Sequence, residues 1–352
     1  MQISEHTFTS TQPINPLPGQ ALETTVASQS ATDKRVQHLL YSPPTSRLAL
    51  ALRMLHLRAA VALLVPTIAG AMLGWWHTGN MTPTTLVLLL SSTFAMILGI
   101  NLLNDSRDYR YAQKSNDVKF IPDLFATTYH LLAAGRLQSG QVSLIGYSLL
   151  LYSLFGQLGL VRLVGWPVLF FYLLSLLLLY TYATPPIRYG YRGWGLGEIG
   201  VFLGYGVLPL IGSYFIVSQT INWLPLWVSL PFGSLTVLIW FNYNLVHYRR
   251  DWLMRKRTLV VSLGPLHTFD ISALLTLIVY ASLLAIASLA HLPLSTLVTL
   301  AALPLALGGF SRLRNEQPHL EDVFRIHLTT LNVSIWTGLL FCAALLVDKL
   351  FS

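Results

Sequence analysis

The chain has 352 residues, of which 54% are hydrophobic and only 10% are Asp, Glu, Lys or Arg. A soluble globular domain has about 25% charged residues, so this composition excludes a soluble protein and indicates an integral membrane protein. The net charge of +8 is explained by basic loops beside a membrane, and we expect no nucleic-acid partner.

The first 45 residues are polar and rich in Ser, Thr, Gln and Pro, and they contain no apolar run. A secretory signal peptide has an apolar core of about 7–15 residues, so none is expected here. We predict a mostly disordered polar tail over residues 1–45 and one transmembrane domain over residues 46–352.

Nine apolar stretches follow this tail, and each approaches the roughly 20 residues that a helix needs to span hydrocarbon. They are continuous and Leu-rich, unlike the alternating strands of an outer-membrane barrel. The sequence therefore predicts an all-α membrane protein with about nine transmembrane helices. The predicted spans are residues 59–76, 84–103, 142–161, 164–183, 197–217, 225–246, 268–290, 293–310 and 328–347.

Lysine and arginine are concentrated in the N-terminal segment and in alternate loops between these spans. Of the 22 such residues, all but Arg162 and Lys349 precede the first span or follow the second, fourth, sixth or eighth. The positive-inside rule places these loops and the N-terminus in the cytoplasm, and we expect a multi-pass protein of a prokaryotic plasma membrane. The single cysteine, Cys342, lies in the last span and cannot form a disulfide within one chain.

A first polar cluster stands at the end of the second span. Asp105 and Asp108 are three residues apart, and Asn101 and Asn104 each precede one of them by four, so all four share a helical face. Carboxylate and amide oxygens suit Mg²⁺, which binds a few carboxylates together with substrate phosphates. The alternative interpretation is a solvated helix end with an asparagine cap.

A second polar cluster stands at the end of the sixth span. His247 and Asp251 are four residues apart and share a helical face. Arg250, Lys256 and Arg257 supply donors for phosphate oxygens. The alternative interpretation is an ordinary basic loop of the kind that membrane topology requires.

Glu198 lies at the start of the fifth span, where a carboxylate must face water, a partner or a substrate. An ion pair with Arg188 or Arg192 is the alternative to a functional role. Aromatic side chains flank the cytoplasmic end of the fourth span, where they can line a pocket and stabilise a carbocation through their ring faces. These aromatic residues are Tyr180, Tyr182, Tyr189 and Tyr191.

Taken together, several stretches resemble the UbiA superfamily of intramembrane prenyltransferases, over most of the chain from about residue 50. Residues 104–109 resemble the first aspartate-rich motif, NDxxDxxxD, and residues 134–142 resemble the stretch entering the third helix. Residues 180–198 are similar to the family's Tyr/Pro/basic segment, and their Gly-Leu-Gly-Glu is most similar to the branch that prenylates 1,4-dihydroxy-2-naphthoate. Residues 251–264 resemble the end of the second aspartate motif and the Lys-Arg-Thr after it.

The resemblance implies a helical bundle around a central cavity and Mg²⁺-dependent transfer of a polyprenyl group from its diphosphate to an aromatic acceptor, such as a quinone precursor. It implies metal ligands at Asp105, Asp108 and Asp251. We hypothesise that His247 or Glu198 is the base in the catalytic proton transfer. A catalytic role is also expected for Asp251. The substrate-binding residues that it implies are Asn101, Asn104, Lys119, Arg188, Tyr189, Arg250, Lys256 and Arg257.

The sequence departs from this family at two positions. The later acid of the first motif is missing, since Asp117 and Asp123 are out of register. The first acid of the second motif, DxxxD, is replaced by His247. Because Mg²⁺ prefers oxygen ligands whereas imidazole suits softer metals, the second metal site is expected to be weakened, completed by water, or absent.

Three alternatives to this function follow. On the same scaffold, a terpene cyclase would let the allylic cation attack its own double bonds without an acceptor. A prenyltransferase could instead use homogentisate, 4-hydroxybenzoate or a chlorophyllide. The third alternative is a non-catalytic lipid-binding or transport protein, which would be expected to carry polar residues near the midplane of several spans.

Overall fold

The computed structural model describes residues 55–114, 128–133, 135–289, 292–310 and 320–351. The predicted tail over residues 1–45 and the loop that holds Lys119, Asp117 and Asp123 lie outside these residues. The described part is helical, with one isolated β-bridge between Arg192 and Arg257. The predicted all-α class is therefore confirmed.

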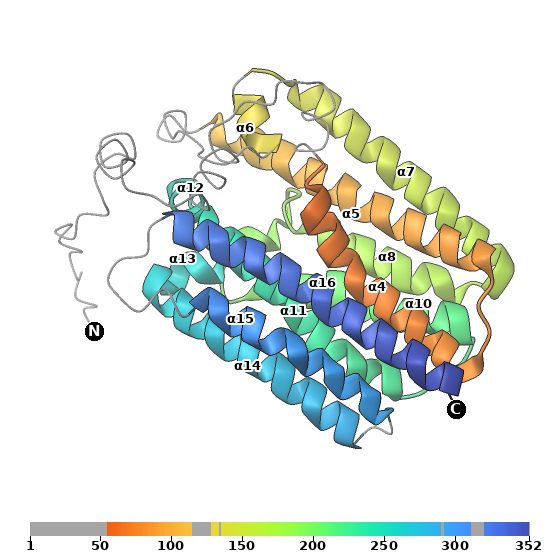
Figure 1. Ribbon diagram of the computed structural model, residues 1–352. Coiled ribbons are helices and arrows are strands. Elements are labelled where there is room, and N and C mark those ends of the chain that lie inside the picture. Colours follow the sequence, from red (N-terminus) through yellow and green to blue (C-terminus); the bar gives the residue numbers. More distant parts are fainter. Residues whose placement is uncertain (1–54, 115–127, 134, 290–291, 311–319, 352) are drawn as a thin grey trace, which may run out of the picture. The chain divides into compact units, whose positions relative to one another are not determined.

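The order of the helices along the described part of the chain can be followed in Figure 1. Their bounds are α4 Leu57–Thr78, α5 Pro83–Ala112, α6 Thr128–Ala133, α7 Ser139–Val164, α8 Pro167–Thr181, η3 Tyr189–Tyr191, α9 Leu196–Val201, η4 Phe202–Val207, α10 Leu208–Ser218, α11 Leu224–Val246, α12 Tyr248–Leu253, α13 Leu259–Leu263, α14 Pro265–Leu289, η5 Leu294–Ala302, α15 Leu303–Phe310 and α16 Leu320–Phe351.

Seven helices of the described part are long and apolar enough to cross a membrane, and one of them, Leu196–Ser218, runs through α9, η4 and α10. Two shorter apolar helical stretches, Pro167–Thr181 and Leu294–Phe310, lie where the fourth and eighth spans were predicted. All nine predicted spans thus coincide with apolar helical segments, which makes the chain a multi-pass membrane protein. The count of about nine spans is approximate because two of the segments are short.

Helix α5 carries the first polar cluster on a rigid support. It begins at Pro83, after Thr82, whose hydroxyl accepts a hydrogen bond from the Thr85 amide and caps the helix. Its 30 residues make a rod of about 45 Å, longer than the hydrocarbon core of about 30 Å. The last turns, with Asp105 and Asp108, therefore continue the same helix out of its apolar part.

The second cluster lies on a broken helix. Helix α11 ends at Val246, and His247 separates it from the short helix α12. The Asp251 amide still donates to the His247 carbonyl at 2.9 Å. The break lies directly before the charged residues Arg249, Arg250 and Asp251.

Helices pack through small residues and interlocking apolar side chains. Helix α5 lies beside α7, and α4 lies beside both α10 and α16 (Figure 1). At the α4–α10 contact, a Cβ atom on Gly70 would come within 2.2 Å of the Leu210 carbonyl oxygen. Glycine therefore allows these two backbones to approach closely, as is common between membrane helices.

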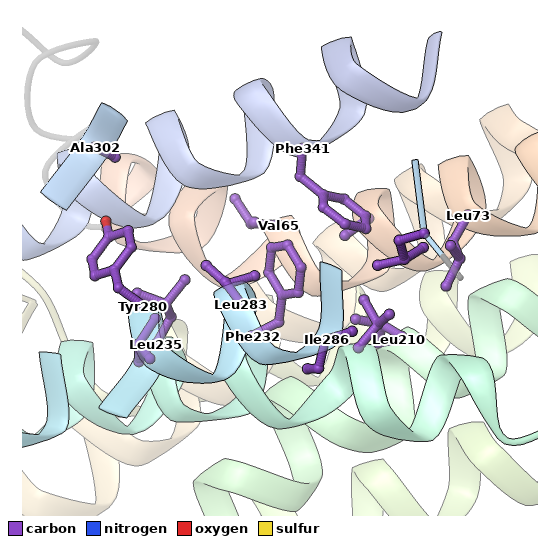
Figure 2. Packing of buried hydrophobic residues seen from close by; sticks show 14 of the residues in the cluster. Val65, Leu73, Leu210, Phe232, Leu235, Tyr280, Leu283, Ile286, Ala302 and Phe341 are labelled. Atoms are coloured by element: carbon purple, nitrogen blue, oxygen red, sulfur yellow. The ribbon is translucent and has the colours of Figure 1, made fainter. Parts of the chain in front are cut away.

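The largest apolar cluster joins α4, α10, α11, α14 and α16 (Figure 2). Its centre holds Phe232 and Phe341, whose rings meet edge to face at 5.2 Å between centroids. Val65, Leu210 and Leu283 pack around them. Since lipid is as apolar as these side chains, close packing rather than exclusion from water is what stabilises the contact.

Candidate functional site

A cavity opens among α4, α5, α11 and α16, with about 550 Å³ of empty space, part of it open to solvent. One part of its wall is charged and polar, and the rest is aromatic and aliphatic. The lining residues are His56, Ala59, Leu63, Asn101, Asn104, Asp105, Asp108, Tyr182, Ile239, Trp240, Tyr243, Lys256 and His327. An amphipathic cavity of this kind can hold a molecule with a charged head and an apolar body.

Helix α5 contributes four predicted residues to this wall, namely Asn101, Asn104, Asp105 and Asp108. They lie on one face because their spacing of three and four residues matches the helical turn. The Asn101 side-chain oxygen accepts from the Tyr205 hydroxyl at 3.2 Å. The Asn104 side-chain oxygen is buried without a hydrogen-bond partner among the described residues, so it is available to a ligand.

Asp105 is paired with a histidine that the sequence interpretation did not select. The Nε2 atom of His56 lies 3.0 Å from Oδ2 of Asp105. His56 stands just before α4 with left-handed backbone angles, φ 47 and ψ 41, an uncommon conformation for a residue with a Cβ. It is close to Asp105 only because α4 packs beside α5.

Lys256 brings the two carboxylate clusters together. Its Nζ atom lies 3.2 Å from Oδ2 of Asp108 and 3.7 Å from Oδ2 of Asp251. The other oxygen of Asp108 accepts from the Tyr191 hydroxyl, and the other oxygen of Asp251 lies 3.3 Å from Nη2 of Arg250. The two predicted metal ligands Asp108 and Asp251 therefore share one ammonium group.

The charge states of these groups follow from their surroundings. Burial alone would lower the pKa of Lys256, but the Asp108 and Asp251 carboxylates outweigh it and hold that pKa well above its ordinary value. Burial, followed by the neighbouring Asp108 charge, raises the pKa of Tyr191 well above 10. Lys256 is therefore a permanent cation and Tyr191 a neutral donor to Asp108 at neutral pH.

Backbone contacts hold Lys256 in place. The Arg257 amide donates to the Tyr191 carbonyl at 3.2 Å, which joins the loop before α9 to the loop after α12. One oxygen of Glu198 accepts from the Leu259 amide at 3.3 Å, at the first residue of α13. Glu198 thus connects the same two segments, and it is not among the residues that line the cavity.

The other predicted substrate-binding residues lie around this centre rather than on its wall. The Arg188 guanidinium lies between the rings of Tyr111 and Tyr191, at 4.1 and 4.3 Å from their centroids. The Tyr189 hydroxyl donates to the Leu178 carbonyl at 2.6 Å. Arg250 is buried against Asp251, whereas Arg257 is exposed, and Lys119 lies outside the described residues.

His247, a predicted catalytic residue, is buried behind the cavity wall. Its ring packs against Tyr243 with 4.5 Å between centroids, and it is not one of the lining residues. Burial lowers the pKa of His247 well below 6.5, and the positive charges of Arg250 and Lys256 lower it further. The imidazole is therefore neutral at pH 7.

The sequence interpretation missed several lining residues. Trp240 and Tyr243 lie on the α11 face that leads to His247, and a helical projection from His247 would have pointed to Tyr243. His327 lies near the start of the last apolar span, two residues after Arg325, and an ionisable residue in such a span marks a candidate functional position. His56 had no such signal, because its role depends on the packing of α4 against α5.

The donor chemistry of the first cluster suits a hard cation. Within the described residues, no group of three His, Cys, Asp or Glu side chains is arranged to hold a metal ion. Asp105 and the unpartnered oxygen of Asn104 offer oxygen donors beside the cavity. Mg²⁺ usually takes one or two carboxylates and completes its shell with water and substrate phosphates, so this partial set fits it.

Known proteins share both the sequence and the fold of this chain. Residues 63–336 match the UbiA prenyltransferase family. The chain is 28% identical over 284 residues to a protein of Synechocystis sp. named 2-carboxy-1,4-naphthoquinone phytyltransferase, a match that covers 79% of this chain and 87% of that protein. It is 25% identical over 280 residues to the 1,4-dihydroxy-2-naphthoate octaprenyltransferase of Mycobacterium leprae, covering 77% and 87%.

Solved structures show the same fold at low sequence identity. A UbiA homolog from Archaeoglobus fulgidus, bound to GPP and Mg²⁺, superposes with a TM-score of 0.57 and 17% identity, over 84% of this chain and 99% of that one. The same homolog bound to DMAPP and Mg²⁺ superposes with a TM-score of 0.59 and the same identity and coverage. At this identity, the likeness concerns the helical architecture.

Proposed function

The chain belongs to the UbiA prenyltransferase family, and from this premise we propose that it transfers a polyprenyl group from a prenyl diphosphate to an aromatic acceptor such as 1,4-dihydroxy-2-naphthoate. The observation that carries this proposal is the division of the cavity wall. Asp105, Asp108 and Lys256 form a charged part, and Trp240 and Tyr243 belong to an aromatic part. This division matches a diphosphate head joined to an apolar chain.

The charged part receives the diphosphate. Lys256 carries a permanent positive charge beside the cavity, and its ammonium can donate to phosphate oxygens as the leaving group gains charge. Arg250 and Arg257 add positive charge to the surrounding segments, and a role for Lys119 stays a prediction from the sequence. Such preorganised charges are most effective in a site from which water is excluded.

Asp105 and Asp108, with the side-chain oxygen of Asn104, would hold Mg²⁺, and Asp251 adds a carboxylate 3.7 Å from Nζ of Lys256. When bound, this ion neutralises charge on the diphosphate oxygens. In support, the A. fulgidus homolog of the same fold was solved with GPP and Mg²⁺. In this chain, His247 stands where the second family motif has its first acid, and the third acid of the first motif is missing. A single strongly bound ion is therefore the simplest arrangement.

The aromatic part stabilises the allylic cation that remains after the diphosphate has left. Tyr182, Trp240 and Tyr243 line the cavity beside the charged groups, and their ring faces attract a cation. Trp240 donates to the Tyr182 hydroxyl at 2.9 Å, which fixes both rings. The acceptor carbon then attacks the cation.

The names of the similar proteins indicate which class of acceptor to expect. Two of them are named for naphthoate or naphthoquinone substrates, although they differ in the prenyl group, phytyl in one and octaprenyl in the other. A dihydroxynaphthoate-type acceptor is therefore the proposal, in the quinone pathway of a prokaryotic plasma membrane. Following the positive-inside rule, the diphosphate head would enter from the cytoplasm.

A product assay tests this function. The purified protein in detergent with Mg²⁺ is given geranylgeranyl diphosphate, with and without 1,4-dihydroxy-2-naphthoate, and the lipids are identified by mass spectrometry. A prenylated naphthalene product is expected only with the acceptor. A cyclised terpene formed without acceptor would replace this function with that of a terpene cyclase, and absence of turnover with all tested acceptors would favour a lipid-binding protein.

A further inference from the structure

His327 is a buried histidine on α16 that lines the cavity. Its side chain is mostly buried, and the residue is 7% exposed. The ring donates a hydrogen bond to the Ile239 carbonyl of α11, while Nδ1 has no hydrogen-bond partner among the described residues. A neutral imidazole has one donor and one acceptor nitrogen, so this arrangement leaves the lone pair on Nδ1.

Within the described residues, the surroundings of His327 place no hydrogen-bond donor on this nitrogen. The Tyr243 ring packs beside it at 5.7 Å between centroids, which places His327 next to the aromatic part of the wall. His56 and Arg58 of the α4 end and His247 of the α11 end are the ionisable groups that act on it electrostatically. None of them donates a hydrogen bond to Nδ1.

We propose that His327 is the general base of the reaction, a role that rests on the proposed transfer to a hydroxylated aromatic acceptor. As the bond between the allylic carbon and the diphosphate oxygen breaks, the diphosphate leaves with the electron pair. A ring carbon of the acceptor forms the new C–C bond while the hydroxyl proton of the acceptor passes to Nδ1 of His327 and the hydroxyl oxygen becomes a carbonyl. The ring becomes aromatic again when the hydrogen on that carbon moves to the carbonyl oxygen. The resulting imidazolium then releases this proton to water or to the departing diphosphate.

His327 fits this role better than the two bases predicted from the sequence. A general base must lie within hydrogen-bond reach of the proton that it removes. His327 lines the cavity, whereas His247 and Glu198 are not among the lining residues. Glu198 is also occupied by the Leu259 amide.

The test separates proton transfer from ionisation of the diphosphate. His327→Gln keeps an N–H donor for the Ile239 carbonyl but offers no basic nitrogen. Two products are measured in detergent with Mg²⁺ and geranylgeranyl diphosphate: prenylated 1,4-dihydroxy-2-naphthoate, and the prenyl alcohol formed by slow solvolysis without acceptor. Loss of a general base lowers a rate by about 10²–10⁴-fold, so transfer is expected to fall by about that factor while solvolysis stays within about twofold.

His267 supplies a matched control, because it is an exposed histidine at the start of α14 and does not line the cavity. His267→Gln is expected to leave both rates unchanged. As a second readout, electron-poor acceptors whose hydroxyl is already ionised at the assay pH should restore transfer in His327→Gln. A variant that fails to fold would lose both rates, so the wild-type protein is also assayed in D₂O, where transfer but not solvolysis should slow.

Two results would overturn the role of His327. One is transfer by His327→Gln at the wild-type rate, and the other is an equal fall of transfer and solvolysis in a folded variant without rescue by ionised acceptors. Failure of the proposed function gives a different result, because the wild-type protein itself would then form no prenylated acceptor.

Discussion

At the scale of single residues, the site depends on Lys256 and the two carboxylates that contact it. Its ammonium is shared by Asp108 and Asp251, which lie on segments more than a hundred residues apart in sequence. A buried ion pair contributes little net stability, but removing one partner leaves the other charge uncompensated. Lys256 is therefore expected to stabilise the fold around the site, in addition to its proposed role in binding the diphosphate.

Replacing Lys256 by Met is expected to destabilise the protein by about 3–5 kcal/mol, because two buried carboxylates lose their shared cation. Thermal or denaturant unfolding in detergent measures this change. The double variant Lys256→Met with Asp251→Asn should recover part of the loss, since it removes one of the two repelling charges. Equal stability of the single variant and the wild type would show that the carboxylates are solvated.

Replacing Asp105 by Asn is expected to weaken the apparent binding of Mg²⁺ in the presence of diphosphate by about 10–100-fold. The estimate follows from the loss of one charge-assisted contact, worth about 1.5–3 kcal/mol, at about 1.4 kcal/mol for each factor of ten. Titration with Mn²⁺, followed by electron paramagnetic resonance, measures it. Asp270→Asn, an exposed aspartate in α14, is the matched control, and equal weakening in both variants would rule out a specific site at Asp105.

At the scale of secondary structure elements, two hydrogen bonds connect the region around the start of α9 with the segment that leads into α13. The amide of Arg257 bonds to Tyr191, and the carboxylate of Glu198 bonds to the Leu259 amide. These two contacts hold the segment that carries Lys256. The geometry thus favours a positioning role for Glu198, while a role as base remains a prediction from the sequence.

Substitutions of Glu198 distinguish these two roles. Glu198→Gln keeps an oxygen that accepts from the Leu259 amide, so transfer should stay within about threefold of the wild type if a neutral hydrogen bond, worth about 1 kcal/mol, replaces the original one. Glu198→Ala should lose more activity and also stability. If Gln and Ala were equally inactive while both variants remained stable, Glu198 would be a base instead.

The α4–α10 contact predicts a steric effect at Gly70. Gly70→Ala places a methyl group against the Leu210 carbonyl and the Ser213 hydroxyl oxygen, each 2.2 Å away, and overpacking of this kind costs about 1–3 kcal/mol. Thermal unfolding in detergent measures this loss. Gly308→Ala in α15 is the control, since its Cβ would meet nothing within 4 Å, and it should be neutral or slightly stabilising.

At the scale of the whole molecule, the orientation in the membrane is a prediction from charge alone. Trp194 and Ile221 are both about nine-tenths exposed, at 92% and 90%, and they lie at opposite ends of the helix Leu196–Ser218. The positive-inside rule assigns the loop of Trp194 to the cytoplasm and the loop of Ile221 to the outer side.

Labelling of intact cells tests this orientation. In a Cys342→Ala background, a membrane-impermeant maleimide should label Ile221→Cys but not Trp194→Cys, and permeabilised cells should show labelling of both. The opposite pattern in intact cells would mean that the diphosphate head enters from the outer side.

Much of the site followed from local sequence patterns. Spacing alone predicts that one helical face carries Asn101, Asn104, Asp105 and Asp108. The structure puts these residues on the cavity wall. Lys256 was selected as a phosphate-binding residue, but its position between two carboxylates was not foreseen. Spacing describes neighbours on one helix, whereas this contact joins α5 to the segment between α12 and α13.

From the sequence alone, membrane insertion, helical class and the approximate spans were determined, because hydrocarbon requires long apolar segments whose backbone hydrogen bonds are satisfied internally. The tertiary structure alone decided that His56 meets Asp105 and that His327 reaches the cavity from the last helix. These residues are isolated in sequence, and their positions depend on which helices pack together. Such packing is set by close steric fit, as at Gly70, and hydrophobic periodicity carries little information about it.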